Sequence, residues 1–181
     1  MDVMGMENLK SKIRRIPNFK GVVFWDITPL LKDRKAFREC IKLMADHYRD
    51  KQIDVVVSSE ARGFIFGAAL AYELGVGFVP IRKKGKLPSE TVTITYEKEY
   101  EKDTIEIHKD AIEIGQRVLV LDDLLATGGT IKANVELVEK LGGVVAGICV
   151  LIELNYLKGR DLLENKYDIF SLISCRTTEK M

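Results

Sequence analysis

The sequence predicts an α/β protein with a mainly parallel central sheet flanked by helices. Short, continuously apolar runs alternate with amphipathic helical segments, and polar turns join them. The clearest unit begins with the apolar run 118–121, passes through Asp122 and Asp123 to a glycine-bearing turn, and enters a helical pattern at Ile131. In open α/β sheets, ligands bind at such junctions between the carboxyl end of a strand and the amino end of a helix.

Helices are indicated by apolar residues at helical spacing and by capping residues. They are expected over residues 7–15, 33–50, 64–74, 131–141 and 155–165. Pro17 ends the first of these helices, Asp33 can cap the second, and Gly75 closes the third.

Buried strands are indicated by short runs of valine, isoleucine and leucine. They are expected over residues 54–58, 76–81, 118–121, 144–151 and 167–171, and residues 21–26 form another short apolar run. Residues 91–96 and 103–107 alternate polar and apolar side chains instead, which predicts a hairpin. Its charged tip, 97–102, is expected to form a flexible flap over a ligand.

Composition limits the classes of function. The 181 residues suit one α/β domain, and the balance of 28 basic and 27 acidic residues predicts no nucleic-acid or membrane partner. The N-terminus lacks the apolar run of a secretory signal. Three scattered cysteines are typical of reduced thiols in a cytoplasmic protein. With only two histidines, any metal is expected to be a hard cation held by oxygen ligands.

The turn after Asp123 has the residue types of an anion cradle. Gly128 and Gly129 permit backbone angles that let successive N–H groups converge, and the helix dipole favours a negative charge there. Thr127 and Thr130 add hydroxyl donors, and Ala126 completes the turn. It is not a nucleoside-triphosphate P-loop, because the lysine of that motif is missing.

The adjacent carboxylates narrow the choice of ligand. Asp122 and Asp123 would repel a phosphate, so their partners are expected to be a sugar diol or a metal ion. A phosphate at one end and a diol at the other indicate a ribose phosphate. The alternative is an ordinary strand–helix corner with a capping threonine.

A second strand–turn–helix unit carries Ser59, Glu60, Ala61, Arg62 and Gly63 in its turn. Such a turn suits a second anion, although a surface turn with a Glu–Arg pair fits the residues almost equally well. A third strand is followed by four cations around a glycine: Arg82, Lys83, Lys84 and Lys86. They form either a solvated loop or a clamp for pyrophosphate.

Together these stretches resemble the type I phosphoribosyltransferases. The motifs are V-L-V-L-D-D-L-L-A-T-G-G-T at 118–130, S-E-A-R-G-F at 59–64, R-K-K-G-K-L-P at 82–88, E-Y at 99–100 and E-L-x-x-L-K-G-R at 153–160. They occur in the family's order and cover nearly the whole chain. The double-aspartate loop alone would indicate only the superfamily, and the others narrow the resemblance to the members that act on adenine.

The resemblance implies a role for each motif. The 5′-phosphate would lie on Ala126, Thr127, Gly128, Gly129 and Thr130, and the ribose hydroxyls on Asp122 and Asp123. Pyrophosphate would contact Ser59, Glu60, Ala61, Arg62, Arg82, Lys83, Lys84, Lys86 and Tyr100, with a non-proline cis peptide near Glu60. The purine would bind at Val23, Phe24, Arg62 and Leu154.

The resemblance also implies a catalytic group of Arg62, Asp122, Asp123 and Glu99, the last being our hypothesis for the group that assists proton movement. Mg²⁺ would be held largely by the substrate's own oxygens. The enzyme would be a homodimer of one domain, 1–181, in which residues 1–30 contribute to the purine pocket and residues 82–107 form the clamp loop and flap.

The implied activity is transfer of the 5-phosphoribosyl group from phosphoribosyl pyrophosphate to N9 of adenine, giving AMP and pyrophosphate in purine salvage. One alternative is the same chemistry on hypoxanthine, guanine or xanthine, supported by Trp25, where the family usually has arginine. Another is a non-catalytic sensor of phosphoribosyl pyrophosphate, for which the basic N-terminal helix is too short to bind DNA. A pyrophosphokinase would need a triphosphate site, which we do not find in the sequence.

Overall fold

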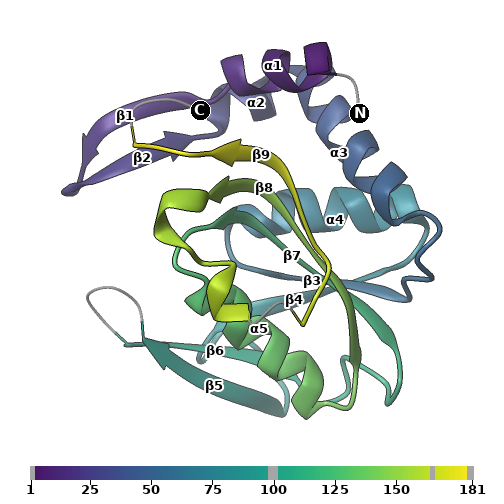
Figure 1. The fold of residues 1–181 in the computed structure, drawn as a ribbon. Helices are drawn as coiled ribbons and strands as arrows, with labels where there is room; N and C mark the ends of the chain where they lie inside the picture. The colour runs from purple at the N-terminus through teal and green to yellow at the C-terminus, as the bar shows by residue number, and fades with distance from the viewer. Residues whose placement is uncertain (1–2, 98–101, 164–165, 179–181) are drawn as a thin grey trace.

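The computed structural model describes residues 3–97, 102–163 and 166–178 and contains a seven-stranded sheet (Figure 1). Its strands are β3 (Val55–Ser59), β4 (Gly77–Lys83), β5 (Thr91–Glu97), β6 (Lys102–His108), β7 (Arg117–Leu125), β8 (Val144–Leu154) and β9 (Ile169–Cys175). Their order is β5-β6-β4-β3-β7-β8-β9. Strands β4, β3, β7, β8 and β9 are parallel, while β5 and β6 form an antiparallel hairpin. The predicted mainly parallel sheet is confirmed.

The remaining elements surround this sheet. A separate two-stranded sheet pairs β1 (Arg14–Phe19) with β2 (Val22–Asp26). The helices are α1 (Val3–Ser11), α2 (Thr28–Lys32), α3 (Arg34–Tyr48), α4 (Arg62–Leu74) and α5 (Gly129–Lys140), followed by the 3₁₀ turns η1 (Asn155–Leu157) and η2 (Asp161–Leu163). Within the described residues, every helix is too short or too polar to pass through a bilayer.

Alternation along the buried strands builds two cores. On β7, Leu119 and Leu121 face the core under α1 to α4, whereas Val118 and Val120 face the core under α5. All four side chains are fully buried, as expected for a parallel strand covered on both faces. Figure 1 shows the same layers, with α3 and α4 on one side of the sheet and α5 on the other.

One predicted helix ends earlier than expected, and another is wrong. The helix expected over 7–15 ends at Ser11, and Arg14–Phe19 forms a strand that contains Pro17. Pro17 lies where the pairing with β2 is irregular, so its missing N–H breaks no regular ladder. The helix expected over 155–165 is two short 3₁₀ turns within the described residues. Lys158 adopts a left-handed backbone with φ of 54° and interrupts helical continuation.

Two hairpins frame one edge of the main sheet. The pairs β1–β2 and β5–β6 project from the same side of the molecule, above and below the ends of β7 and β8 in Figure 1. The carboxyl ends of β3, β4, β7 and β8 all lie at this edge, because the strands are parallel. The fold therefore collects the polar turns of several strands between two hairpins.

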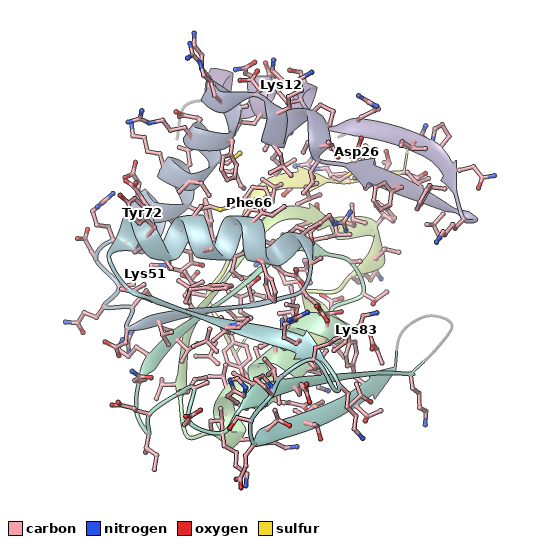
Figure 2. All side chains as sticks on the ribbon, turned by 180° about the vertical axis from the view of Figure 1, so that it is seen from behind. Lys12, Asp26, Lys51, Phe66, Tyr72 and Lys83 are labelled. Carbon is pink, nitrogen blue, oxygen red and sulfur yellow. The ribbon has the colours of Figure 1, made fainter. Side chains whose placement is uncertain are left out.

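One buried hydrogen bond offers a test of the packing. The fully buried Tyr48 hydroxyl donates to the Ile148 carbonyl at 2.8 Å, joining α3 to β8. Tyr48→Phe is expected to lower the free energy of unfolding by about 1–2 kcal/mol, because it removes a buried hydrogen bond. Urea unfolding measures the change. Tyr72→Phe is the control, since Tyr72 lies on α4 with 88% of its surface exposed (Figure 2); an equal loss in both variants would contradict the assignment.

Candidate active site

A polar cavity of about 320 Å³ lies at the carboxyl edge of the sheet. It is lined by most of the predicted phosphate and pyrophosphate residues: Ser59, Glu60, Ala61, Arg62, Lys83, Asp122, Asp123, Ala126, Thr127, Gly128, Gly129 and Thr130. These residues come from turns that are far apart in sequence. The parallel register of β3 and β7 brings the turns together.

The predicted anion cradle joins β7 to α5. Gly128 adopts φ of +90°, a left-handed conformation that favours glycine, and α5 begins at Gly129. The first N–H groups of a helix have no intrahelical acceptor, so they are available to an anion at this end. The Thr130 hydroxyl lies 3.1 Å from the Tyr96 hydroxyl, which joins this turn to the end of β5, near the tip of the β5–β6 hairpin.

The two aspartates lie at the end of β7 and are each 8% exposed. The Asp122 carboxylate accepts a hydrogen bond from the Asp123 N–H at 2.9 Å, and Asp123 Oδ2 lies 2.7 Å from Arg62 Nε. Burial raises the pKa of both carboxyl groups. The charge of Asp123 raises the pKa of Asp122 further, whereas the Arg62 guanidinium opposes the rise at Asp123.

The turn after β3 contains the predicted non-proline cis peptide, between Glu60 and Ala61. The Glu60 N–H donates to the Ile81 carbonyl at 3.0 Å. The Glu60 carboxylate accepts from the Lys83 N–H at 2.7 Å and pairs with Arg82 Nε at 2.9 Å. Glu60 therefore binds the turn to the end of β4.

Gly63 allows α4 to begin directly against the aspartate pair. A Cβ at Gly63 would lie 2.9 Å from Asp122 Oδ1 and closer still to the Ser58 hydroxyl. Any larger residue would push the start of α4 away from β3 and β7. This close approach places Arg62 within reach of Asp123.

The predicted cationic clamp is only partly assembled at the cavity. Lys83 lines it, at the end of β4 beside the β5–β6 hairpin (Figure 2). Arg82 is paired with Glu60, and Lys84 and Lys86 are exposed outside the cavity lining. Glu99 and Tyr100 lie outside the residues that the structure describes.

A second cavity, of about 400 Å³ and mainly apolar lining, adjoins the first. It brings together the predicted base-binding residues Val23, Phe24, Arg62 and Leu154, with the Arg62 guanidinium 5.0 Å from the centre of the Phe24 ring. Trp25 also lines this cavity although it is only 6% exposed. Its Nε1 has no hydrogen-bond partner among the described residues.

Sequence reasoning missed several lining residues. Tyr96, Asp103 and Ile105 line the polar cavity from the hairpin, and Ile152, Tyr156, Leu157 and Thr178 line the apolar one. Strand alternation could have placed Tyr96 on the same face as the buried Ile94. No local signal pointed to Thr178, because its position depends on how the chain after β9 packs.

The two cavities share Arg62, Asp123, Leu124, Ala126 and Thr127. A ligand can therefore extend from the anion cradle, past the aspartates, to the apolar cavity.

Among the described residues, no cluster of three or more His, Cys, Asp or Glu side chains could hold a metal ion. The aspartate pair alone, with Asp123 already bound to Arg62, does not form a protein-built metal site.

Known proteins share this architecture. Residues 26–180 match the family model described as phosphoribosyl transferase domain. The class of protein that the fold and the joined cavities define is therefore a phosphoribosyltransferase.

The adenine phosphoribosyltransferase of Acidobacterium capsulatum is 56% identical over 169 residues, covering 92% of this chain and 93% of that protein. The solved adenine phosphoribosyltransferase of Thermoanaerobacter pseudethanolicus is 55% identical, with a TM-score of 0.91 and coverage of 94% and 99%. The Saccharomyces cerevisiae enzyme, solved with an imino-altritol bisphosphate and adenine, is 40% identical, with a TM-score of 0.87 and the same coverage. The chain belongs to the adenine phosphoribosyltransferase family, which confirms the resemblance read from the sequence.

The raised pKa of Asp122 predicts a pH-dependent stability cost. The pKa in the folded protein exceeds that in the unfolded chain, so ionisation opposes folding. The cost is absent below the unfolded pKa and grows as the pH rises toward the folded value. We expect Asp122→Asn to raise the free energy of unfolding by about 1–2 kcal/mol at pH 8, with the gain vanishing near pH 4.

Chemical unfolding from pH 4 to pH 8 measures this difference. Asp46→Asn is the control, because Asp46 lies on α3 with half of its side chain exposed. A gain for Asp122→Asn that did not change with pH would show that burial of the charge is not its cause.

Proposed function

We propose that the chain transfers the 5-phosphoribosyl group from phosphoribosyl pyrophosphate to N9 of adenine, giving AMP and pyrophosphate in purine salvage. Family membership supports the reaction, and the observation that carries it is the junction of the two cavities. A polar cavity suited to a phosphorylated sugar opens through Arg62 and Asp123 into an apolar cavity suited to a flat base. Sugar carbon and base nitrogen would meet at that junction.

The 5′-phosphate would bind the turn 126–130, where the left-handed Gly128 and the start of α5 present backbone N–H groups. Asp122 and Asp123 would accept hydrogen bonds from the ribose 2′- and 3′-hydroxyls. These partners are neutral, so they avoid the repulsion that a phosphate would meet beside two carboxylates. Arg62, 2.7 Å from Asp123, would orient that carboxylate toward the sugar.

Pyrophosphate would leave toward the turn Ser59–Arg62 and Lys83, which face the same cavity. Mg²⁺ would enter with the substrate and remain on its pyrophosphate oxygens, where it neutralises charge. Arg82, Lys84, Lys86 and Tyr100 would complete the clamp. Arg82, on β4, and Lys84 and Lys86, on the loop after it, do not line the cavity, so this step would need movement of these side chains or of that loop.

The reaction breaks the bond between C1 of ribose and the pyrophosphate oxygen and forms a bond from C1 to N9 of adenine. Positive charge develops on the sugar while negative charge develops on the leaving group, so fixed cations and N–H groups near pyrophosphate lower the barrier. Phe24 and Leu154 would hold the purine between them. Holding base and sugar in line supplies the proximity effect, and a closed flap excludes water. The N9 proton would pass to Glu99.

Further proposals concern the oligomeric state, the cellular location and the domain organisation of the enzyme. A homodimer is supported by the resemblance, in which a basic residue of the clamp loop reaches across the interface; Lys84 and Lys86 are exposed and do not line the cavity of their own chain. A cytoplasmic location is supported by three buried cysteines that form no disulfide among the described residues. We also propose that residues 1–181 act as one domain, with 1–30 contributing to the purine pocket and 82–107 forming the clamp and flap.

The substrate assignment predicts a specific product pattern. Protein, Mg²⁺ and phosphoribosyl pyrophosphate are expected to yield AMP and pyrophosphate with adenine, measured by chromatography of the nucleotide and by a pyrophosphate assay. Hypoxanthine, guanine, xanthine and orotate are tested separately under the same conditions. No product with adenine would refute the proposal, and product with a 6-oxopurine alone would make the Trp25-based alternative the correct one.

The proton-transfer role of Glu99 predicts a loss of turnover without a loss of folding. Glu99→Gln is expected to lower kcat with adenine by about 10²-fold, the lower range for removal of one acid–base group. Initial-rate kinetics at saturating substrates measure it. Glu101→Gln, two residues along the same flap tip, is the matched control. Unchanged turnover in Glu99→Gln would remove Glu99 from that role.

A further inference from the structure

The segment after β8 contacts both halves of the site. Tyr156 and Leu157 line the apolar cavity, while Gly159 is buried against the turn that forms the anion cradle. The roles proposed above leave Gly159 and its neighbour Arg160 without a function. The packing of Gly159 and the hydrogen bonds of Arg160 indicate a function for both.

Gly159 and Gly128 are packed backbone against backbone. A Cβ at Gly128 would lie 2.5 Å from the Gly159 carbonyl oxygen. A Cβ at Gly159 would lie 2.9 Å from the Gly128 nitrogen and closer still to the Ala126 carbonyl oxygen. Real Cβ atoms essentially never approach other atoms within 3.0 Å. Two turns that touch this closely can move only together.

Arg160 fixes the position of Gly159. Its Nε and Nη2 donate to the two carboxylate oxygens of Glu153 at 2.9 and 2.6 Å, and its Nη1 donates to the Ile169 carbonyl at 3.1 Å. Glu153 is 4% exposed whereas the Arg160 side chain is 38% exposed, so this is a partly buried, bidentate ion pair. The hydrogen bonds from Arg160 lower the pKa of Glu153, which keeps its carboxylate ionised.

The ion pair ties the segment to β8, which lies beside the strand that leads into the anion cradle. Glu153 is paired in the sheet with Leu125, the residue directly before Ala126. Between Glu153 and Arg160 the chain is largely exposed. The left-handed conformation of Lys158 then reverses its direction, and Gly159 is buried. Glu153, Arg160 and Gly159 therefore form a brace between β8 and the cradle.

We infer that Glu153 and Arg160 are positioning residues that set the shape of the 5′-phosphate cradle by pressing Gly159 against Ala126 and Gly128. The inference rests on the proposed binding of ribose phosphate at 126–130. Neither side chain lines the polar cavity, so both act through the backbone of Gly159. The turn Ser59–Arg62 and Lys83, which would hold pyrophosphate, lie outside this brace.

The two ends of the substrate can be probed separately. Ribose 5-phosphate and pyrophosphate are each used as inhibitors of the full-length enzyme, and their inhibition constants are measured in Arg160→Gln, Glu153→Gln and Gly159→Ala. Gly77→Ala is the control for the glycine, because its new Cβ would come no closer than 3.6 Å to Val55. Arg49→Gln is the control for the arginine, since Arg49 pairs with Asp46 and Glu73 on exposed surface. Thermal unfolding shows that each variant is folded at the assay temperature.

The expected result is selective. The inhibition constant for ribose 5-phosphate and the KM for phosphoribosyl pyrophosphate rise about ten- to hundredfold in the three variants, as expected when a positioning group shifts by about 1 Å. The inhibition constant for pyrophosphate stays within about twofold, and both controls behave as wild type. Arg160→Lys, which keeps one charged donor, is expected to recover part of the lost affinity.

The inference would be overturned if the inhibition constants for ribose 5-phosphate and pyrophosphate rose equally, or if neither changed. If Arg160→Gln does not fold, Arg160→Lys and Gly159→Ala decide by the same comparison. Wild-type protein that makes no AMP from adenine and does not bind ribose 5-phosphate would overturn the proposed function together with this inference. If the wild-type enzyme makes AMP from adenine but the variants affect both inhibitors equally, the inference is overturned and the proposed function stands.

Discussion

The site depends on the burial of two adjacent carboxylates at the end of β7. A buried carboxylate is costly unless it is neutralised or paired, and Arg62 supplies the pairing for Asp123 at 2.7 Å. Arg62 can reach it because α4 begins directly against β3 and β7, where Gly63 leaves no room for a side chain. This charge pairing therefore fixes the turn before α4 relative to the turn before α5. Together with the parallel register of β3 and β7, it sets the relative positions of these two turns.

The two cavities beside this pair place different physical demands on the residues that line them. The polar cavity relies on backbone geometry and charge, and few residue types satisfy those demands. The apolar cavity relies on side-chain shape from β2, the end of β8 and the segment after it. The segment after β8 contributes to both, because it supplies Tyr156 to the apolar cavity and packs Gly159 against Ala126 and Gly128, which line the polar one.

Much of this arrangement could be predicted from the sequence, because its signals are local. The apolar run 118–121, the double aspartate and the glycine turn predicted the strand–turn–helix unit correctly, and Asp33 caps α3 through its side chain as expected. The failures have non-local causes. Residues 14–19 form a strand only because β2 pairs with them, and residues 155–163 cannot form one helix once Gly159 must meet Gly128. The Glu60–Arg82 pair, 22 residues apart, could not be foreseen from either turn alone.

The separation of β1 and β2 from the main sheet has an evolutionary consequence. Phe24 is hydrogen-bonded into a two-stranded sheet of its own, so a substitution or a shift of register there leaves the seven-stranded ladder intact. This wall of the apolar cavity can thus change while the strands that lead to the turns 59–62 and 126–130 stay in register. Under the proposed function, a fold built in this way can accept a different nucleobase without changing how it holds the sugar.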